Sequence, residues 1–389
     1  MSQVQSAAAS FRDRHGFWRS QHLAASGKIF LLYALLLGGV AFHLYRSPIY
    51  DMDSIQYMGN ALLMEDTDVV RVHHRVYAEL QQSVPKGVRD DLLGRELGAP
   101  ADQNKSRQER AANPLRFAEF LPLFAIRPLY NQTLWLVSKT GLGLVRSGIL
   151  ISVVSYFALG LLLFLWVRKY AAHTVALAIP TLLMLSPPLT MLGRDPTSDA
   201  LATLVAFGSL YLLFQKERPA AGLALALVSI YFRTDFVVLA GLVILACWLE
   251  RRVDFWKAFV LAAVALGSVF FINHFAGDYG FKMLYYRNFV AVPVAPGEMT
   301  VQFSFRDYVA ALRSGVTQIM NSFFLPFLIV GVLGLASKRT RMLFAVSLAY
   351  LLLHFLILPN WQERWFGVFY LSMGVCAAAS LYPEREPAE

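Results

Sequence analysis

Repeated apolar runs separated by short charged stretches constrain the fold of this chain more than any other feature of its sequence. A helix needs about 20 predominantly apolar residues to cross a bilayer. Charged residues make up only 16 % of the chain, whereas soluble domains average about 25 %. The pattern therefore predicts an all-α, polytopic transmembrane protein with about ten spans, two of them short. The predicted spans cover residues 29–45, 147–167, 171–192, 200–214, 220–232, 236–249, 258–275, 323–336, 342–358 and 366–381.

Basic residues are concentrated in every second stretch that connects the spans, and this alternation predicts the orientation. If the N-terminal tail is cytoplasmic, each short external loop has at most one basic residue, as the positive-inside rule requires. We therefore expect an integral protein of the bacterial inner (plasma) membrane whose long loops face the periplasm or exterior. The excess of nine positive charges follows this pattern and indicates no nucleic-acid partner. The predicted cytoplasmic connections carry Arg168 and Lys169; Lys216 and Arg218; Arg251, Arg252 and Lys257; Lys338, Arg339 and Arg341; and Arg385.

This topology divides the chain into seven parts. The long first external loop contains proline-broken, partly apolar pieces that predict interfacial helices, and a polar stretch between residues 85 and 113 that predicts a mobile loop. The parts are a cytoplasmic tail (1–28), a signal-anchor span (29–45), an external loop (46–146), a central bundle (147–275), a second external loop (276–322), C-terminal transmembrane helices (323–382) and a cytoplasmic tail (383–389).

The segment 220–249 is compatible with two topologies, because each of its halves is shorter than a full crossing. A single tilted helix would invert everything that follows it. Two short helices that meet at the polar turn "YFRTDF" preserve the alternation of basic stretches, and we prefer them.

Charged residues gather at the ends of spans that this topology places outside. The sequence "YDMDSIQYMGNAL" follows the first span directly, and three later turns each combine an arginine with carboxylates. Ionisable groups at this depth are costly unless they pair or line an aqueous site, so function is the default interpretation. The alternative is that arginines and carboxylates neutralise one another or extend to lipid headgroups. The residues are Asp51 and Asp53; Arg194, Asp195 and Asp199; Arg233 and Asp235; and Glu363 and Arg364.

These residue types favour chemistry at a phosphate. A guanidinium binds phosphate oxygens in a bidentate manner, and a carboxylate can take the proton of an attacking hydroxyl. Together they predict glycosyl transfer from a polyprenyl-phosphate sugar to a hydroxyl acceptor. Lys282 and Arg287 in the second external loop are further candidates for binding lipid headgroups or the donor phosphate.

The layout resembles the C-type (GT-C) superfamily of integral-membrane glycosyltransferases. That superfamily places an acidic motif in the first external loop, and "YDMDSIQYMGNAL" and "GRDPTSDALATL" resemble its external segments. The resemblance implies hexosyl or pentosyl transfer in the cell envelope, with Asp51 or Asp53 as the catalytic carboxylate. The outward arginines Arg194, Arg233 and Arg364 would then face the lipid phosphate.

Helical spacing separates the two aspartates. In a helix that begins near Asp51, residues at i and i+2 do not share a face. Asp53, Gln56, Tyr57 and Asn60 do share one, so we expect Asp53 to be the general base. Asp51 then remains as a helix cap, a second contact or a metal ligand. No cofactor is required, although Mg²⁺ or Mn²⁺ would suit paired carboxylates beside phosphate.

Other functions remain open at this stage. A transporter or flippase of an anionic lipid-linked substrate would place ionisable groups near mid-membrane, whereas here they lie at one end. A polymerase or ligase of lipid-linked glycans also fits outward arginines. The acceptor class (glycan, lipid or protein) and the need for a partner subunit stay open. We expect His73 and His74 to be solvated and His354 to be a packing histidine.

Overall fold

The computed structural model describes residues 27–95, 101–290, 293, 295–299 and 304–381. Nearly all of the predicted cytoplasmic tails, 1–28 and 383–389, therefore lie outside the described residues. Within the described part all regular structure is helical, so the prediction of an all-α fold is confirmed.

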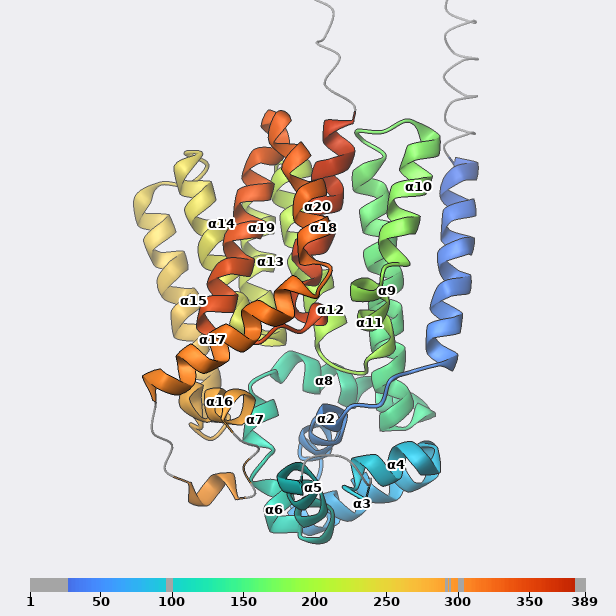
Figure 1. The fold of residues 1–389 in the computed structure, drawn as a ribbon, viewed down its shortest axis with the longest axis vertical. Coiled ribbons are helices and arrows are strands. Elements are labelled where there is room, and N and C mark those ends of the chain that lie inside the picture. Colours follow the sequence, from blue (N-terminus) through green and yellow to red (C-terminus); the bar gives the residue numbers. More distant parts are fainter. Residues whose placement is uncertain (1–26, 96–100, 291–292, 294, 300–303, 382–389) are drawn as a thin grey trace, which may run out of the picture.

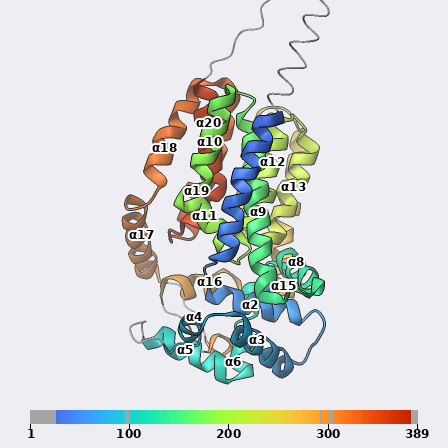
Figure 2. The ribbon, with the colours of Figure 1, turned by 90° about the vertical axis from the view of Figure 1, so that its right-hand side faces the viewer.

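The helices form two layers, a tall apolar bundle and a polar cap at one end of it (Figure 1). The cap helices lie beneath the bundle in both views, and α17 lies across the side of the molecule between the two layers (Figure 2). The bundle contains Gly27–Arg46, α9 (Leu144–Val167), α10 (His173–Met184), α11 (Pro187–Arg194), α12 (Asp199–Leu210), α13 (Pro219–Phe232), α14 (Val237–Leu249), α15 (Phe255–Phe275), α18 (Phe324–Val332), α19 (Lys338–Ile357) and α20 (Gly367–Ser380). The cap and its border contain α2 (Met52–Leu62), α3 (Val69–Ser83), α4 (Lys86–Leu92), α5 (Ala101–Ala112), α6 (Pro114–Ala118), α7 (Pro122–Ala125), α8 (Pro128–Val137), α16 (Gly280–Phe289) and α17 (Phe305–Met320).

Short π or 3-10 segments continue or connect several of these helices. They are η1 (Ser138–Leu142), η2 (Tyr211–Gln215), η3 (Thr234–Phe236), η4 (Pro296–Glu298), η5 (Leu333–Ala336) and η6 (Glu363–Phe366).

The bundle supports a membrane protein, but it does not confirm ten spans. Among the described residues, four helices are long and apolar enough to cross a membrane, and up to six are if each of two bent pairs counts as one span. The four are Gly27–Arg46, Leu144–Val167, Phe255–Phe275 and Thr340–Ile357. The remaining predicted spans fall on helices that are too short or too sharply bent for that test.

Proline explains the break in the predicted span 171–192. Pro187 and Pro188 follow Ser186, and a residue before proline is disfavoured in the helical region. Ser186 adopts an extended backbone, and the helices on either side of it meet at a bend of 64°. Helix α11 therefore leaves the direction of α10 and ends at Arg194, beside the segment that follows the first helix.

The segment 220–249 forms two helices, as we preferred. Helix α13 ends at Phe232, Arg233 is extended (φ −152°, ψ 115°), and η3 leads into α14. Past the far end of α14, the Arg252 guanidinium donates to the carbonyl of Leu213, which precedes α13 in the chain (Nη1–O 2.8 Å). The two helices therefore run back alongside each other, and the "YFRTDF" turn lies at the end of the bundle that faces the cap.

The predicted mobile loop between residues 85 and 113 is wrong for most of its length, because α4 and α5 form here; residues 96–100 lie outside the described part of the chain. Residues such as alanine, lysine, glutamine and arginine favour helix even in a polar segment. Tertiary contacts then hold α5 in place: Arg107 pairs with Asp91, Ser106 Oγ donates to the carbonyl of Pro293 (3.0 Å), and Arg110 stacks over the Phe120 ring (4.3 Å). A polar composition concealed a structured element.

The proline-broken pieces between residues 113 and 139 do form short helices, since α6, α7 and α8 each begin with proline, which is favoured at the first helical position. Phe117 in α6, Phe124 in α7 and Phe120 in the turn between them are fully buried. These helices therefore contribute a protein core to the cap, beside the α2 helix.

Close packing between η5 and α20 can be tested at Gly334. A Cβ atom there would lie 2.4 Å from Cys376 Cβ and 2.9 Å from its Cα, which is too close for either backbone to stay in place. We expect Gly334→Ala to destabilise the fold by about 1–3 kcal/mol, measured as a lower melting temperature in detergent. The matched control is Gly267→Ala in α15, where a Cβ would meet nothing within 4 Å. Equal melting temperatures for the two variants would contradict this packing.

Candidate functional site

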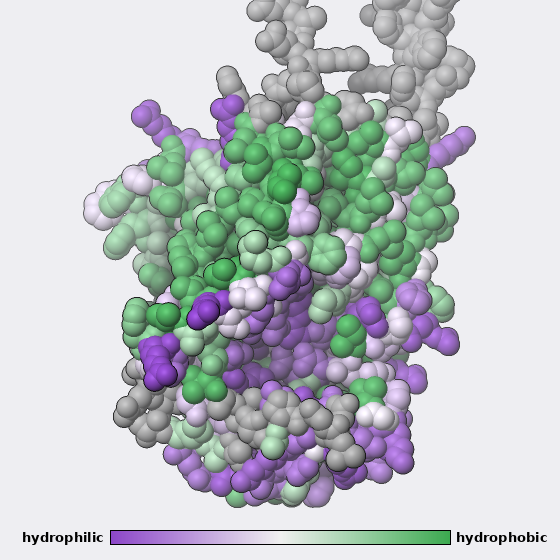
Figure 3. All heavy atoms as spheres, in the orientation of Figure 1, coloured by the Kyte–Doolittle hydropathy of each residue, from purple (hydrophilic) through white to green (hydrophobic). Residues whose placement is uncertain are grey.

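A polar cavity of about 430 Å³ lies between the bundle and the cap. In the space-filling view, hydrophilic side chains fill a hollow below the apolar surface of the bundle (Figure 3). Eight of the predicted site residues line this cavity: Asp51, Asp53, Tyr57, Asp199, Arg233, Asp235, Arg287 and Arg364. The structure thus brings together residues that are up to 313 positions apart in the chain.

Arg364 lies at the centre of the carboxylates. It is 7 % exposed and belongs to η6, immediately before α20. Its guanidinium pairs with Asp195, with Asp51 (Nη1–Oδ2 2.9 Å), with Asp199 (Nε–Oδ2 3.2 Å) and with Asp53 (Nη2–Oδ2 3.4 Å). One buried cation therefore joins the start of α2 to the turn between α11 and α12.

Arg233 forms a second centre beside the first. It is 3 % exposed and pairs with Asp199 (Nη1–Oδ1 2.5 Å) and with Asp235 (Nη2–Oδ2 2.7 Å). On the far side of Asp235, His354 Nε2 lies 2.8 Å from its Oδ2. Because Asp199 contacts both Arg233 and Arg364, the two centres form one continuous network. His354 was expected to be a packing histidine, and it also makes a polar contact within this network.

Asp51 is the N-cap of α2, as one of the open alternatives held, and its carboxylate accepts from the backbone N–H of Asp53 (3.2 Å). It also lines the cavity. The expectation that only Asp53 would join the polar face is therefore wrong, because the capping position turns the Asp51 side chain back over the first turn. Both carboxylates face the same space.

The two aspartates differ in their electrostatic surroundings. Burial raises the pKa of Asp51, and the neighbouring Asp53 carboxylate raises it further against the opposing effect of Arg364. Burial also acts to raise the pKa of Asp53, but Arg287 (Nη2–Oδ1 3.1 Å) and Arg364 outweigh it and hold this pKa below its ordinary value. At a given pH near neutrality, Asp51 is the better proton acceptor of the two.

The cap supplies arginines that the sequence reasoning missed. Arg107, Arg110 and Arg127 all line the cavity, from α5 and from the residue before α8. Arg110 is 4 % exposed, and burial lowers its pKa to about 10. Asp53 acts on both Arg110 and Arg127 through space, but neither forms an ion pair with a carboxylate among the described residues. Arg110 donates to the Ser106 carbonyl and stacks on Phe120, and Arg127 lies over aromatic rings.

A buried guanidinium without a carboxylate partner is costly and favours an anionic ligand. One signal could have identified two of these residues, because Arg107 and Arg110 are three positions apart and share a helix face. Because this segment was predicted to be a loop, the helical spacing of the two arginines carried no weight. Arg127 lies before a proline, where no periodic pattern marks it. The rest of the polar lining that was not predicted consists of Gln103, Thr234, Asn288, Asn360 and Gln362.

Several predicted site residues do not line the cavity. Arg194 lines a separate groove. Asp195 supports Arg364 from outside the lining. Glu363 accepts from Tyr370 and from the backbone N–H of Phe323. The remaining three are Gln56, which is buried at 1 % exposure, Asn60, which donates to the carbonyls of Gln56 and Leu121, and Lys282, whose side chain is outside the described residues.

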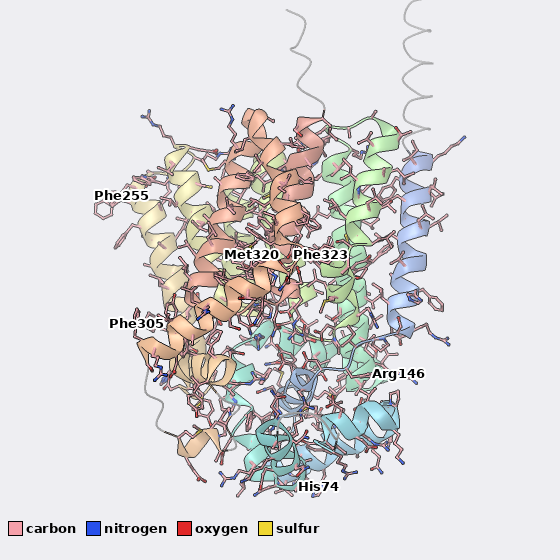
Figure 4. The ribbon with its side chains drawn as sticks, in the orientation of Figure 1. His74, Arg146, Phe255, Phe305, Met320 and Phe323 are labelled. Carbon is pink, nitrogen blue, oxygen red and sulfur yellow. The ribbon has the colours of Figure 1, made fainter. Side chains whose placement is uncertain are left out.

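His73 was expected to be solvated, and this is wrong. It is 4 % exposed and its Nε2 lies 3.0 Å from the carbonyl of Arg110, so it supports the end of α5. His74 is exposed at the outer surface of the cap (Figure 4). Within the described part of the chain, no group of three or more His, Cys, Asp or Glu residues could hold a metal ion.

No protein-family model, curated protein or solved structure matches this chain.

Asp195 provides a test of the buried network. Burial raises its pKa to about 7, with Arg364 opposing the shift and the carboxylates of Asp51 and Asp199 adding to it. The folded protein then retains a proton that the unfolded protein has released, so this contribution to stability is present at low pH and is lost as pH rises towards about 7. We expect the melting temperature of the parent protein to fall relative to that of Asp195→Asn between about pH 5 and about pH 8.

The matched control is Glu217→Gln, which changes an exposed carboxylate that has no histidine among its described contacts. Its difference from the parent should not change over this pH range. Parallel melting curves for the parent and Asp195→Asn would show that Asp195 does not titrate in this way.

Proposed function

We propose that this protein is a membrane glycosyltransferase of the GT-C type, which moves a sugar from a polyprenyl-phosphate donor to a hydroxyl acceptor. The site then faces the extracytoplasmic side of the membrane, and the short and bent helices of the bundle complete about ten crossings. The basic stretches at the bundle end opposite the cap support this orientation. A bacterial inner membrane is the proposed location.

One observation carries the proposal, namely the separation of charge across the cavity. Carboxylates from the start of α2 and from the bundle turns gather around Arg233 and Arg364, whereas Arg110 and Arg127 in the cap form no ion pair with a carboxylate among the described residues. Guanidinium groups that are not neutralised suit a phosphate. Carboxylates across the same space suit a hydroxyl that must lose its proton.

The reaction follows from this arrangement. An acceptor hydroxyl gives its proton to a cavity carboxylate while its oxygen forms a bond to the anomeric carbon of the sugar. The bond from that carbon to the phosphate oxygen breaks, and the lipid phosphate leaves with the electron pair. Arg110, Arg127 and Arg287 stabilise the negative charge that develops on the phosphate.

Asp51 is better suited than Asp53 to be the base, which reverses the order that helical spacing favoured. Its raised pKa supports this assignment, since a general base works best when its pKa lies close to the working pH. Asp53 is engaged by Arg287 and Arg364 and has a lowered pKa, so it serves better to hold these two guanidiniums in place.

The base assignment is tested by two asparagine variants. We expect Asp51→Asn to lower kcat by about 10²–10⁴-fold and to remove the acidic limb of the pH–rate profile. Asp53→Asn should lower kcat/KM but keep that limb. The assay follows transfer from a defined polyprenyl-phosphate sugar to a hydroxyl acceptor, with Asp278→Asn as the exposed control. An unchanged acidic limb in Asp51→Asn would return the role to Asp53.

The phosphate role of the cap is tested at Arg127. Loss of one charge-assisted contact of about 1.5–3 kcal/mol should lower kcat/KM by about 10- to 100-fold in Arg127→Gln. Arg95→Gln changes an exposed cap arginine and should leave the rate unchanged. A transporter or flippase would move the lipid-linked substrate across a proteoliposome membrane without forming product, and that outcome would reject glycosyl transfer.

A further inference from the structure

A second groove, of about 620 Å³, lies on the outer surface of the bundle, away from the polar cavity. It runs between the helix Gly27–Arg46 and the bent pair α10 and α11, which lie side by side in Figure 2. The bend at Ser186 turns α11 away from the line of α10, and a Cβ at Gly39 would meet nothing within 4 Å. The groove is therefore open to the medium that surrounds the bundle.

The wall of the groove changes from apolar to polar along its length. Leu36, Val40 and Leu185 line one part, and Leu36 and Leu185 are each 49 % exposed. Ser47, Thr190 and Arg194 line the other part, at the end of the first helix. A wall of this kind matches a lipid molecule, with hydrocarbon against the leucines and a polar headgroup beside the arginine.

The charge of the groove selects the kind of headgroup. Arg194 uses its Nε to donate to the carbonyl of Ser47 (2.9 Å), and its described contacts include no carboxylate. His43 lies in the same lining, and no acidic residue lines the groove. The two terminal nitrogens of Arg194 match the phosphate oxygens of a lipid in number and geometry. A headgroup with net negative charge suits this end better than a zwitterionic one.

We propose that this groove is a binding site for one anionic membrane phospholipid, whose phosphate is bound by Arg194 and whose acyl chain lies along Leu36, Val40 and Leu185. The site is distinct from the donor cavity, and the proposal does not depend on glycosyl transfer.

The bound lipid also reinforces the wall of the polar cavity. The carbonyl of Arg194 accepts a hydrogen bond from the backbone N–H of Ile49 (2.9 Å), and the Arg194 side chain donates to the carbonyl of Ser47. Arg194 therefore holds the short segment that leads to Asp51. The next residue, Asp195, pairs with Arg364. A phosphate that orders the Arg194 guanidinium therefore stabilises the segment that positions two carboxylates of the buried network.

The test compares lipids on the purified full-length protein in detergent. We expect phosphatidylglycerol to raise the melting temperature by a few degrees, on the order expected for saturating one site. Phosphatidylcholine with the same acyl chains should raise it much less. Glycerol phosphate, which has the anionic group without chains, should have no effect. Native mass spectrometry should show one retained phosphatidylglycerol molecule per chain.

Two variants and a control locate the site. Arg194→Gln should lose more than half of the phosphatidylglycerol increment, and Gly39→Trp should do the same by filling the groove without changing Arg194. Arg146→Gln changes another exposed arginine near the cap end of the bundle, outside the groove, and should keep the full increment (Figure 4). The readout is the lipid-dependent increment, so a lower basal stability of a variant does not affect it.

An increment that is equal for phosphatidylglycerol and phosphatidylcholine, or that survives in both Arg194→Gln and Gly39→Trp, would overturn the proposal. An effect of glycerol phosphate equal to that of the lipid would also overturn it, because the groove would then bind a free phosphate and not a phospholipid.

Discussion

The rest of the site depends on the buried guanidinium of Arg364. A charge removed from water costs several kcal/mol unless close counter-charges and hydrogen bonds compensate it, and here four aspartates do so from two distant parts of the chain. Removing the cation would leave those carboxylates facing one another. The same contacts join the cap to the bundle, because Asp51 and Asp53 begin α2, whereas Asp195 and Asp199 flank the turn before α12. The cavity and the junction between the two layers are therefore one structure.

Much of this network could be predicted from the sequence because charge at the ends of apolar helices has few stable arrangements. Arginines and carboxylates recur at the same end of successive helices, so they meet once the helices pack. Which residues pair could not be predicted in the same way. Arg233 does bind its near neighbour Asp235, but Arg194 and Asp195 point to different sites, and Arg364 binds four distant aspartates in place of Glu363. Neighbouring residues at a helix end project in different directions, and only the tertiary packing selects the partner.

The cap was much harder to predict than the bundle. Spans are recognised by length and apolarity, whereas α5 is mostly polar and is held by tertiary contacts with Asp91, Phe120 and the distant Pro293. Without those contacts the same residues suit a solvated loop. The number of crossings was harder to predict than the helices themselves. The apolar runs are visible in the sequence, but apolar composition does not show that the helices bend at Ser186 and between α17 and α18 (68°). Apolar length therefore predicted helices correctly and crossings only in part.

The placement of charge also indicates that the arginines have different roles. Arg233 and Arg364 are surrounded by five carboxylates, namely Asp51, Asp53, Asp195, Asp199 and Asp235. An added anion at those two guanidiniums would have to displace or approach existing negative charges. Arg110, which is buried, and Arg127, which is half-buried, form no ion pair with a carboxylate among the described residues, so they meet less of that competition. If a phosphate binds in this cavity, electrostatics therefore directs it to the cap side, and it leaves the carboxylates free to accept a proton. The arginines that were most conspicuous in the sequence then shape the site, and the less conspicuous ones bind its ligand.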